Sequence, residues 1–153
     1  MTMATVEMSF TPLPAHVRTA RLVATAVARR SGVEEALLDE VRLAVGEACS
    51  RAVEAHQEHC PAEPVRVALT GINGRFEVVV TDTAAVGAPG GTKNGSEAPG
   101  GEQPAVPGDA GQLAVPAELG LAVIEGLADD VEIAHTDAGL SIRMSWPSDG
   151  AAN

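Results

Sequence analysis

Two pairs of charged residues in the N-terminal half have spacings that would let them act together on one helical face. Glu47 and Arg51 are four residues apart, a separation at which an ion pair stabilises a helix by about 0.3–0.5 kcal/mol. Arg18 and Arg21 are three residues apart, and adjacent guanidinium groups offer planar, charge-assisted hydrogen bonds to carboxylates of an acidic partner. The same arginines would equally serve as the solvated face of a helix.

Other combinations of reactive residues give weaker signals. His56, His59 and Cys60 cluster near the end of a helical pattern, but three potential ligands without a clear fourth are poor evidence for a zinc site. Histidines also occur at helix C-termini because the helix dipole favours positive charge there. We therefore expect no metal site, and the sequence contains no nucleophile elbow, P-loop or Rossmann turn.

Composition limits the functions that the chain can have. The 153 residues carry a formal charge of −11, yet residues 1–60 contain six basic and eight acidic side chains against four and thirteen in the remainder. This balance argues against a general nucleic-acid binder and makes the N-terminal part the better place for an acidic partner. With 45% hydrophobic residues, no apolar run long enough for a membrane span and two cysteines, we expect one cytoplasmic domain without disulfides.

Hydrophobic periodicity predicts the elements that position these residues. Apolar residues at helical spacing predict helices over residues 13–31, 34–60 and 119–127. Alternating apolar and polar residues predict strands over residues 6–10, 65–70, 76–81, 131–133 and 140–146. Asn73-Gly74 between two alternating runs predicts a tight hairpin. This order favours a two-layer α/β sandwich, with a mixed, mostly antiparallel sheet covered on one face by three helices.

Residues 83–116 differ in composition from the rest, with 8 Gly and 5 Pro among 34 positions. Such a segment buries too little apolar surface to offset its ordering entropy. A long insert of this kind is either a functional lid or a disordered linker, and the composition does not decide between them. Lys93, the single lysine, lies inside it and would be a candidate phosphate contact if the segment closed over a ligand.

Two stretches resemble a known family. Residues 40–53 (EVRLAVGEACSRAV) and 118–131 (ELGLAVIEGLADDV) are similar to the anti-sigma factor serine kinases of stress-response and sporulation type. That family belongs to the histidine-kinase-like (GHKL, Bergerat) ATPase superfamily. The resemblance covers about residues 5–146 and implies one ATPase-fold domain, with 83–116 as an insert and 147–153 as a flexible tail.

The first of these stretches matches the family's box of a Glu followed four residues later by an Asn. The resemblance implies that Glu47 is the general base for phosphoryl transfer. Arg51 stands where the family has the Asn that ligates Mg²⁺, and a guanidinium, which has only donors, cannot ligate a cation. Glu47 is therefore either a working base or a helix charge paired with Arg51.

Two further boxes depart from the family pattern. Asp82 matches the Asp that meets the adenine amino group, although it could equally form a turn, and Ala84 and Val86 replace the glycines that follow it. In the later Gly-x-Gly box Gly120 remains, and Glu118 puts a carboxylate where a polyphosphate would need the helix N-terminus. All the departures predict that nucleotide binding is weakened or lost.

The partner-binding side matches the family better. Arg21 occupies the position of an Arg that contacts both the sigma factor and its rival, the anti-anti-sigma factor, and Arg18 is its neighbour. The resemblance implies a homodimeric regulator that binds a sigma factor and/or a STAS-domain anti-anti-sigma factor in partner switching to control transcription. We expect no cofactor, no direct nucleic-acid contact and no membrane contact. The alternative is an active ATP- and magnesium-dependent protein serine kinase that phosphorylates its anti-anti-sigma partner, with Arg51 binding phosphate.

Overall fold

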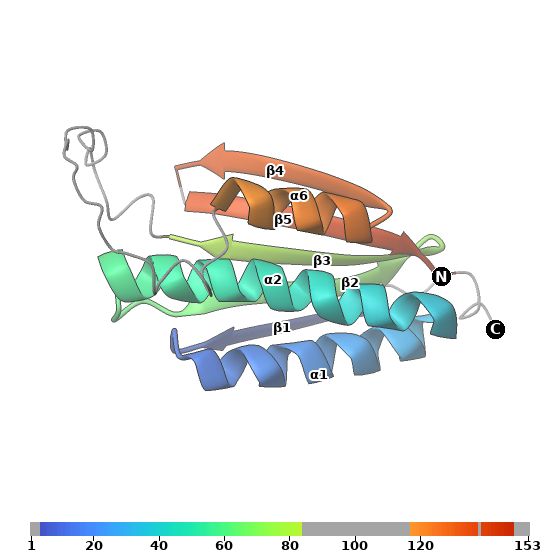
Figure 1. The fold of residues 1–153 in the computed structure, drawn as a ribbon. Helices are drawn as coiled ribbons and strands as arrows, with labels where there is room; N and C mark the ends of the chain where they lie inside the picture. The colour runs from blue at the N-terminus through green and yellow to red at the C-terminus, as the bar shows by residue number, and fades with distance from the viewer. Residues whose placement is uncertain (1–3, 84–116, 138, 149–153) are drawn as a thin grey trace.

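The computed structural model describes residues 4–83, 117–137 and 139–148. Its elements in chain order are β1 (Ala4–Phe10), α1 (Pro14–Ser31), α2 (Glu35–His59), β2 (Val65–Ile72), β3 (Arg75–Asp82), α6 (Ala117–Leu127), β4 (Asp130–Thr136) and β5 (Gly139–Pro147). The helices cover one face of the sheet, and α2 lies between α1 and α6 (Figure 1). This confirms the predicted two-layer α/β fold.

The five strands form one open sheet in the order β1-β2-β3-β5-β4. Each of the four neighbouring pairs is antiparallel, so the parallel pairing that a mixed sheet would contain does not occur among the described strands. The predicted hairpin joins β2 to β3, with positive φ at Asn73 (55°) and Gly74 (77°). β3 lies at the centre of the sheet. After β3 the chain forms α6 and β4 at the edge, and the last strand, β5, then pairs with β3.

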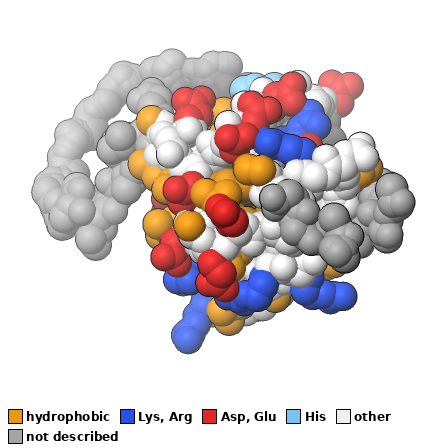
Figure 2. All heavy atoms as spheres, turned by 90° about the vertical axis from the view of Figure 1, so that its right-hand side faces the viewer, with side chains coloured by type: hydrophobic (Ala, Val, Ile, Leu, Met, Phe, Trp, Pro, Cys, Tyr) orange, Lys and Arg blue, Asp and Glu red, His pale blue; other side chains and the backbone are white. Residues whose placement is uncertain are grey.

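The helix ends follow from local sequence. Pro14 begins α1, where its missing N–H costs no hydrogen bond. Gly32 follows the helix with φ 96°, and its N–H donates to the carbonyls of Ala28 and Arg29. Figure 2 shows acidic and basic side chains intermixed over the end of the molecule where α1 ends and α2 begins. Two of these charge contacts are ion pairs, Arg29 with Glu35 and Arg42 with Asp39.

The core between the layers is mostly aliphatic, and its two largest buried side chains are an aromatic pair on β3 and β5. Trp146 is buried against Phe76 at a ring-centroid distance of 6.2 Å. The indole Nε1–H donates to the carbonyl oxygen of Leu127 at 3.1 Å, which satisfies a carbonyl at the end of α6. The last strand therefore holds α6 in place on the sheet.

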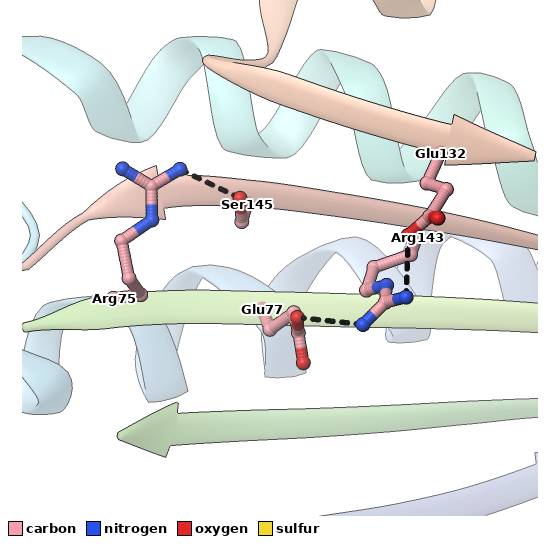
Figure 3. A network of polar contacts seen from close by, with 5 residues as sticks. All are labelled: Arg75, Glu77, Glu132, Arg143 and Ser145. Carbon is pink, nitrogen blue, oxygen red and sulfur yellow. Dashed lines mark hydrogen bonds and ion pairs between the residues drawn. The ribbon is translucent and has the colours of Figure 1, made fainter. Parts of the chain in front are cut away.

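The opposite face of the sheet carries ion pairs between strands. Arg143 on β5 contacts Glu77 on β3 and Glu132 on β4, and Arg75 donates to the hydroxyl of Ser145 at 2.7 Å (Figure 3). A hollow of about 370 Å³ lies on this face over β1, β2 and β3, and no residue that we predicted as functional lines it. Of the described helices, none is both long and apolar enough to cross a membrane.

Candidate functional site

Three of the predicted site residues meet where α2 contacts α6. Gly120 on α6 lies so close to α2 that a Cβ there would be 2.6 Å from Glu47 Oε2 and 3.3 Å from Arg51 Cδ. A side chain at position 120 would therefore displace the Glu47 carboxylate or separate the helices. The glycine allows the carboxylate and the arginine stem to pack against α6, and it brings together residues that are about seventy positions apart in the sequence.

Of the two alternatives for Glu47, the helix charge paired with Arg51 is not found: in the described part of the chain no contact within ion-pair distance joins the two side chains. The helical spacing permits the pair, but both side chains turn toward α6, and Arg51 presents its Cδ there. The Arg51 Nε is buried and finds no hydrogen-bond partner among the described residues. A buried donor without an acceptor is unfavourable, so this nitrogen is suited to an acceptor supplied from outside.

Asp82 ends β3 at the centre of the sheet and is 7% exposed. It continues the inward-facing positions of that strand, so its side chain is directed to the helix layer, toward the C-terminal half of α2. Gly139, which begins β5, has φ 131°, and a Cβ there would lie 2.0 Å from the Asp82 carbonyl oxygen. The close approach of these two backbones holds the Asp82 backbone at this position.

His56 has a structural role that the sequence reasoning missed. The ring is fully buried, Nδ1 donates to the Glu63 carbonyl oxygen at 2.9 Å, and Nε2 accepts the Thr83 N–H at 3.0 Å. Because Nε2 accepts, the ring is the neutral Nδ1–H tautomer. His56 thus connects the last turn of α2 to the residue that follows Asp82. Its place on the apolar face of α2 was the available sequence signal.

The cysteines and histidines of the described residues are not grouped as metal ligands. No group of three His, Cys, Asp or Glu side chains there could hold a metal ion. Burial raises the pKa of the Cys49 thiol to about 12, so this thiol is protonated and inert at neutral pH.

Arg21 lies on the other side of α2 from Gly120. A Cβ at Gly46 would be 2.6 Å from Arg21 Cδ, so the stem of this half-buried arginine packs against α2 at a residue without a side chain. Arg18 is exposed, and neither arginine has an ion pair among the described residues. Gly46 meets α1 and Glu47 meets α6, so the two groups of predicted residues lie on different sides of α2.

The site residues do not fit magnesium. Mg²⁺ requires oxygen ligands in octahedral geometry, whereas Arg51, whose stem lies beside Gly120 with Glu47, has only hydrogen-bond donors and cannot ligate a cation. Ala84, Val86 and Lys93 lie outside the described residues, and Glu118 is the second residue of α6.

Comparison with known proteins identifies the fold. The model of the histidine kinase-like ATPase domain matches residues 10–146. A similar solved structure is that of the RsbU and RsbW domains of Rv1364c from Mycobacterium tuberculosis, with a TM-score of 0.55 and 17% sequence identity. The match covers 95% of this chain and 32% of that chain, so this chain spans about a third of its length. No curated protein matches.

Proposed function

This chain belongs to the histidine kinase-like ATPase domain family, and from that premise we propose that it is a regulatory protein that works by binding other proteins. We further propose that its magnesium-dependent ATP binding is weakened or lost. One observation carries this proposal: the position of the expected magnesium ligand holds Arg51, whose Cδ lies beside Gly120 with Glu47 and whose guanidinium has only hydrogen-bond donors. A cation at that point repels the metal that would have to bridge the phosphates.

The partners that we propose are a sigma factor and a STAS-domain anti-anti-sigma factor, which would compete for α1. Arg18 and Arg21 support this proposal, because they leave donors available to carboxylates of a partner. The solved chain that shares the fold carries an RsbW domain next to an RsbU domain, and a role of the RsbW kind is what we extend to this chain. The relative affinities and concentrations of the partners would set which is bound.

The experiment combines a nucleotide titration with a partner titration. Isothermal calorimetry with ATP and Mg²⁺ should give no saturable heat at millimolar nucleotide, while sigma and anti-anti-sigma factors from the genome that encodes this chain should compete for it in pull-down assays. Saturable, magnesium-dependent ATP binding would contradict the loss of nucleotide binding. Failure of every such partner to bind would contradict the regulatory role.

A second candidate function is an active protein serine kinase, and the buried Arg51 Nε favours it. An unsatisfied guanidinium N–H is a suitable donor to a phosphate oxygen, so Arg51 could hold a phosphate directly while Glu47 acts as the base. Transfer of labelled phosphate from ATP to a serine of the anti-anti-sigma partner would establish this function. The transfer should then be lost in Glu47→Gln and retained in Glu54→Gln, a matched variant on an exposed turn of α2.

A further inference from the structure

We propose that the outer surface of the helix layer is a docking site for one amphipathic helix of an acidic protein partner. The site consists of an apolar stripe, formed by Leu22, Leu43 and Val123, and of the arginines 18 and 21 at its α1 end. This inference rests on the proposed function, because it specifies the surface and the type of partner that the regulatory role requires.

The stripe is made of large apolar side chains that the fold leaves in solvent. Leu22 on α1 is 62% exposed, Leu43 on α2 is 56% exposed and Val123 on α6 is 41% exposed. Single exposed apolar residues are ordinary, but here each of the three helices contributes one. The other large apolar side chains exposed in the described chain, Val6 on β1 and Leu13 before α1, lie outside the helix layer or at its end.

Two close helix contacts set the relative levels of these side chains. Arg21 lies level with Gly46, and Gly120 lies level with the segment from Glu47 to Arg51. α2 runs antiparallel to both α1 and α6 (Figure 1). The stripe residues are one position after Arg21, three before Gly46 and three after Gly120, so at 1.5 Å per residue they lie within about 5 Å of one level.

The stripe therefore crosses the helix layer instead of following one helix. Neighbouring packed helices are about 8–10 Å apart, so three of them span about 20 Å. An amphipathic helix of about four turns is long enough to cover that distance with apolar residues at helical spacing.

The charges at the α1 end indicate the type of partner. Arg29 and Arg42, elsewhere on the same two helices, are paired with Glu35 and Asp39. Arg18 and Arg21 have no such pair with a described residue, although the chain carries 21 acidic side chains. A partner helix with Asp or Glu beside its apolar face would supply the missing carboxylates.

A second copy of this chain is a poorer occupant. In a two-fold dimer through this surface the same patch would face itself, and the residues that define the patch include two arginines and no carboxylate. Like charges placed opposite each other oppose association.

The test uses three stapled helical peptides of about 18 residues, since an unstapled helix of this length is marginally stable in water. One has a leucine face flanked by Glu, one has the same face flanked by Lys, and one has the Glu flank but Ser in place of Leu. We expect the first to bind with micromolar affinity and the other two to bind at least about tenfold more weakly, by fluorescence anisotropy. Equal binding of the Lys-flanked or the Ser peptide would overturn the proposal, as would no binding of any peptide.

The matching protein variants are Leu22→Ser and Leu43→Ser, with Leu13→Ser as the control. Each stripe variant should lower the affinity for the Glu-flanked peptide about tenfold, and Leu13→Ser should change that affinity by less than about twofold. Amide shifts in NMR spectra of the unmodified protein should move on α1, α2 and α6 when the peptide is added, which gives a readout independent of the variants. Shifts confined to other elements would overturn the proposal.

Two further outcomes separate this inference from the proposed function. If sigma or anti-anti-sigma partners bind and the stripe variants do not lower their affinity, the regulatory role stands and the stripe is not the docking site. If the peptide binds as expected but no such partner does, the stripe is a docking site for another kind of protein. A concentration-dependent dimer in sedimentation that Leu22→Ser abolishes would overturn the proposal in favour of a second copy.

Discussion

The arginines on the two faces of this molecule differ in whether they form ion pairs. On the open face of the sheet, Arg143 contacts Glu77 and Glu132, and Arg75 contacts the hydroxyl of Ser145 (Figure 3). Arg75 also forms an ion pair with Asp129. In the helix layer, Arg29 and Arg42 are paired with Glu35 and Asp39, whereas the other arginines have no ion pair with a described residue: Arg18, Arg21, Arg30 and Arg51.

The difference shows that most arginines on the open face have an acidic partner within the described chain, whereas most arginines of the helix layer do not. The two pairs of Arg143 join neighbouring strands, so they contribute to the strand register within one molecule, and Arg75 on β3 pairs with Asp129 just before β4. The unpaired arginines of the helix layer contribute nothing comparable inside the described chain. We therefore assign the helix layer to binding and the open sheet face to structure, and the following experiments test that division from the largest expected effect to the smallest.

Trp146→Ala should destabilise the protein most, because the core between the two faces depends on this side chain. Loss of the buried indole should lower the free energy of unfolding by about 3–5 kcal/mol in urea denaturation. Trp146→Phe keeps the ring against Phe76 but loses the hydrogen bond to Leu127, so it should cost about 0.5–1.5 kcal/mol more than its change in volume does. If the alanine variant lowered the free energy of unfolding by less than about 1 kcal/mol, the Trp146 side chain would contribute little to the packing of the helices on the sheet.

Alkaline pH should lower the stability through Cys49, on the sheet-facing side of α2. Burial raises the thiol pKa from near 9 to about 12, so the folded state retains a proton that the unfolded chain releases. The free energy of unfolding should therefore fall as the pH rises from about 9 to about 12. Few other groups titrate in this range, because the chain has no Tyr and one Lys.

Cys49→Ala and Cys60→Ala form the matched pair for this prediction. The decline measured by urea denaturation at several pH values should flatten in the first variant and persist in the second, since Cys60 is only half-buried. The same decline in both variants would show that another group is responsible.

Arg21→Glu should distinguish binding from stability. The substitution reverses a charge on the proposed docking surface, so the affinity for an acidic partner should fall at least about tenfold, which is about 1.4 kcal/mol. Arg143→Glu on the open face is the matched charge reversal and should leave partner affinity unchanged. Surface plasmon resonance measures both, and equal effects would remove the distinction between the faces.

Arg143→Gln should have the smallest effect, because its ion pairs are exposed to solvent. The carboxylates of Glu132 and Glu77 raise the pKa of Arg143, so the guanidinium stays charged, but exposed pairs contribute about 0.2–1 kcal/mol. The loss in unfolding free energy should vanish in 1 M salt. Arg66→Gln, at an exposed position on the same face and without an ion pair to a described residue, should cost nothing measurable. A loss that persists in high salt would contradict an electrostatic origin.

The fold was largely predictable from local patterns. The helix expected over residues 13–31 is Pro14–Ser31, and the hairpin at Asn73-Gly74 forms because both residues adopt positive φ. The helix expected over residues 119–127 begins two residues earlier, at Ala117, because apolar periodicity locates a helix better than its first turn. These features depend on side chains and backbone angles within a few residues of one another.

The candidate site was less predictable, because its contacts join distant segments. Spacing alone favoured a pair between Glu47 and Arg51, yet both side chains meet α6 at Gly120. His56 was explained by the helix dipole, which favours histidine at a helix C-terminus, yet its buried ring forms hydrogen bonds with the backbone of Glu63 and Thr83. The roles proposed for Glu47, Arg51, Asp82, Gly120, Arg18 and Arg21 stay predictions.

The amino-acid sequence by itself determined the helices, the strands, the hairpin and the residue types at each family position, because periodicity and turn chemistry act over short distances. The tertiary structure decided which of those residues share a surface. Gly46 and Gly120 let α1 and α6 pack closely against opposite sides of α2, and that packing leaves Arg51 without its helical partner and aligns Leu22, Leu43 and Val123. Such contacts follow from the packing of whole helices, which no single stretch of sequence encodes.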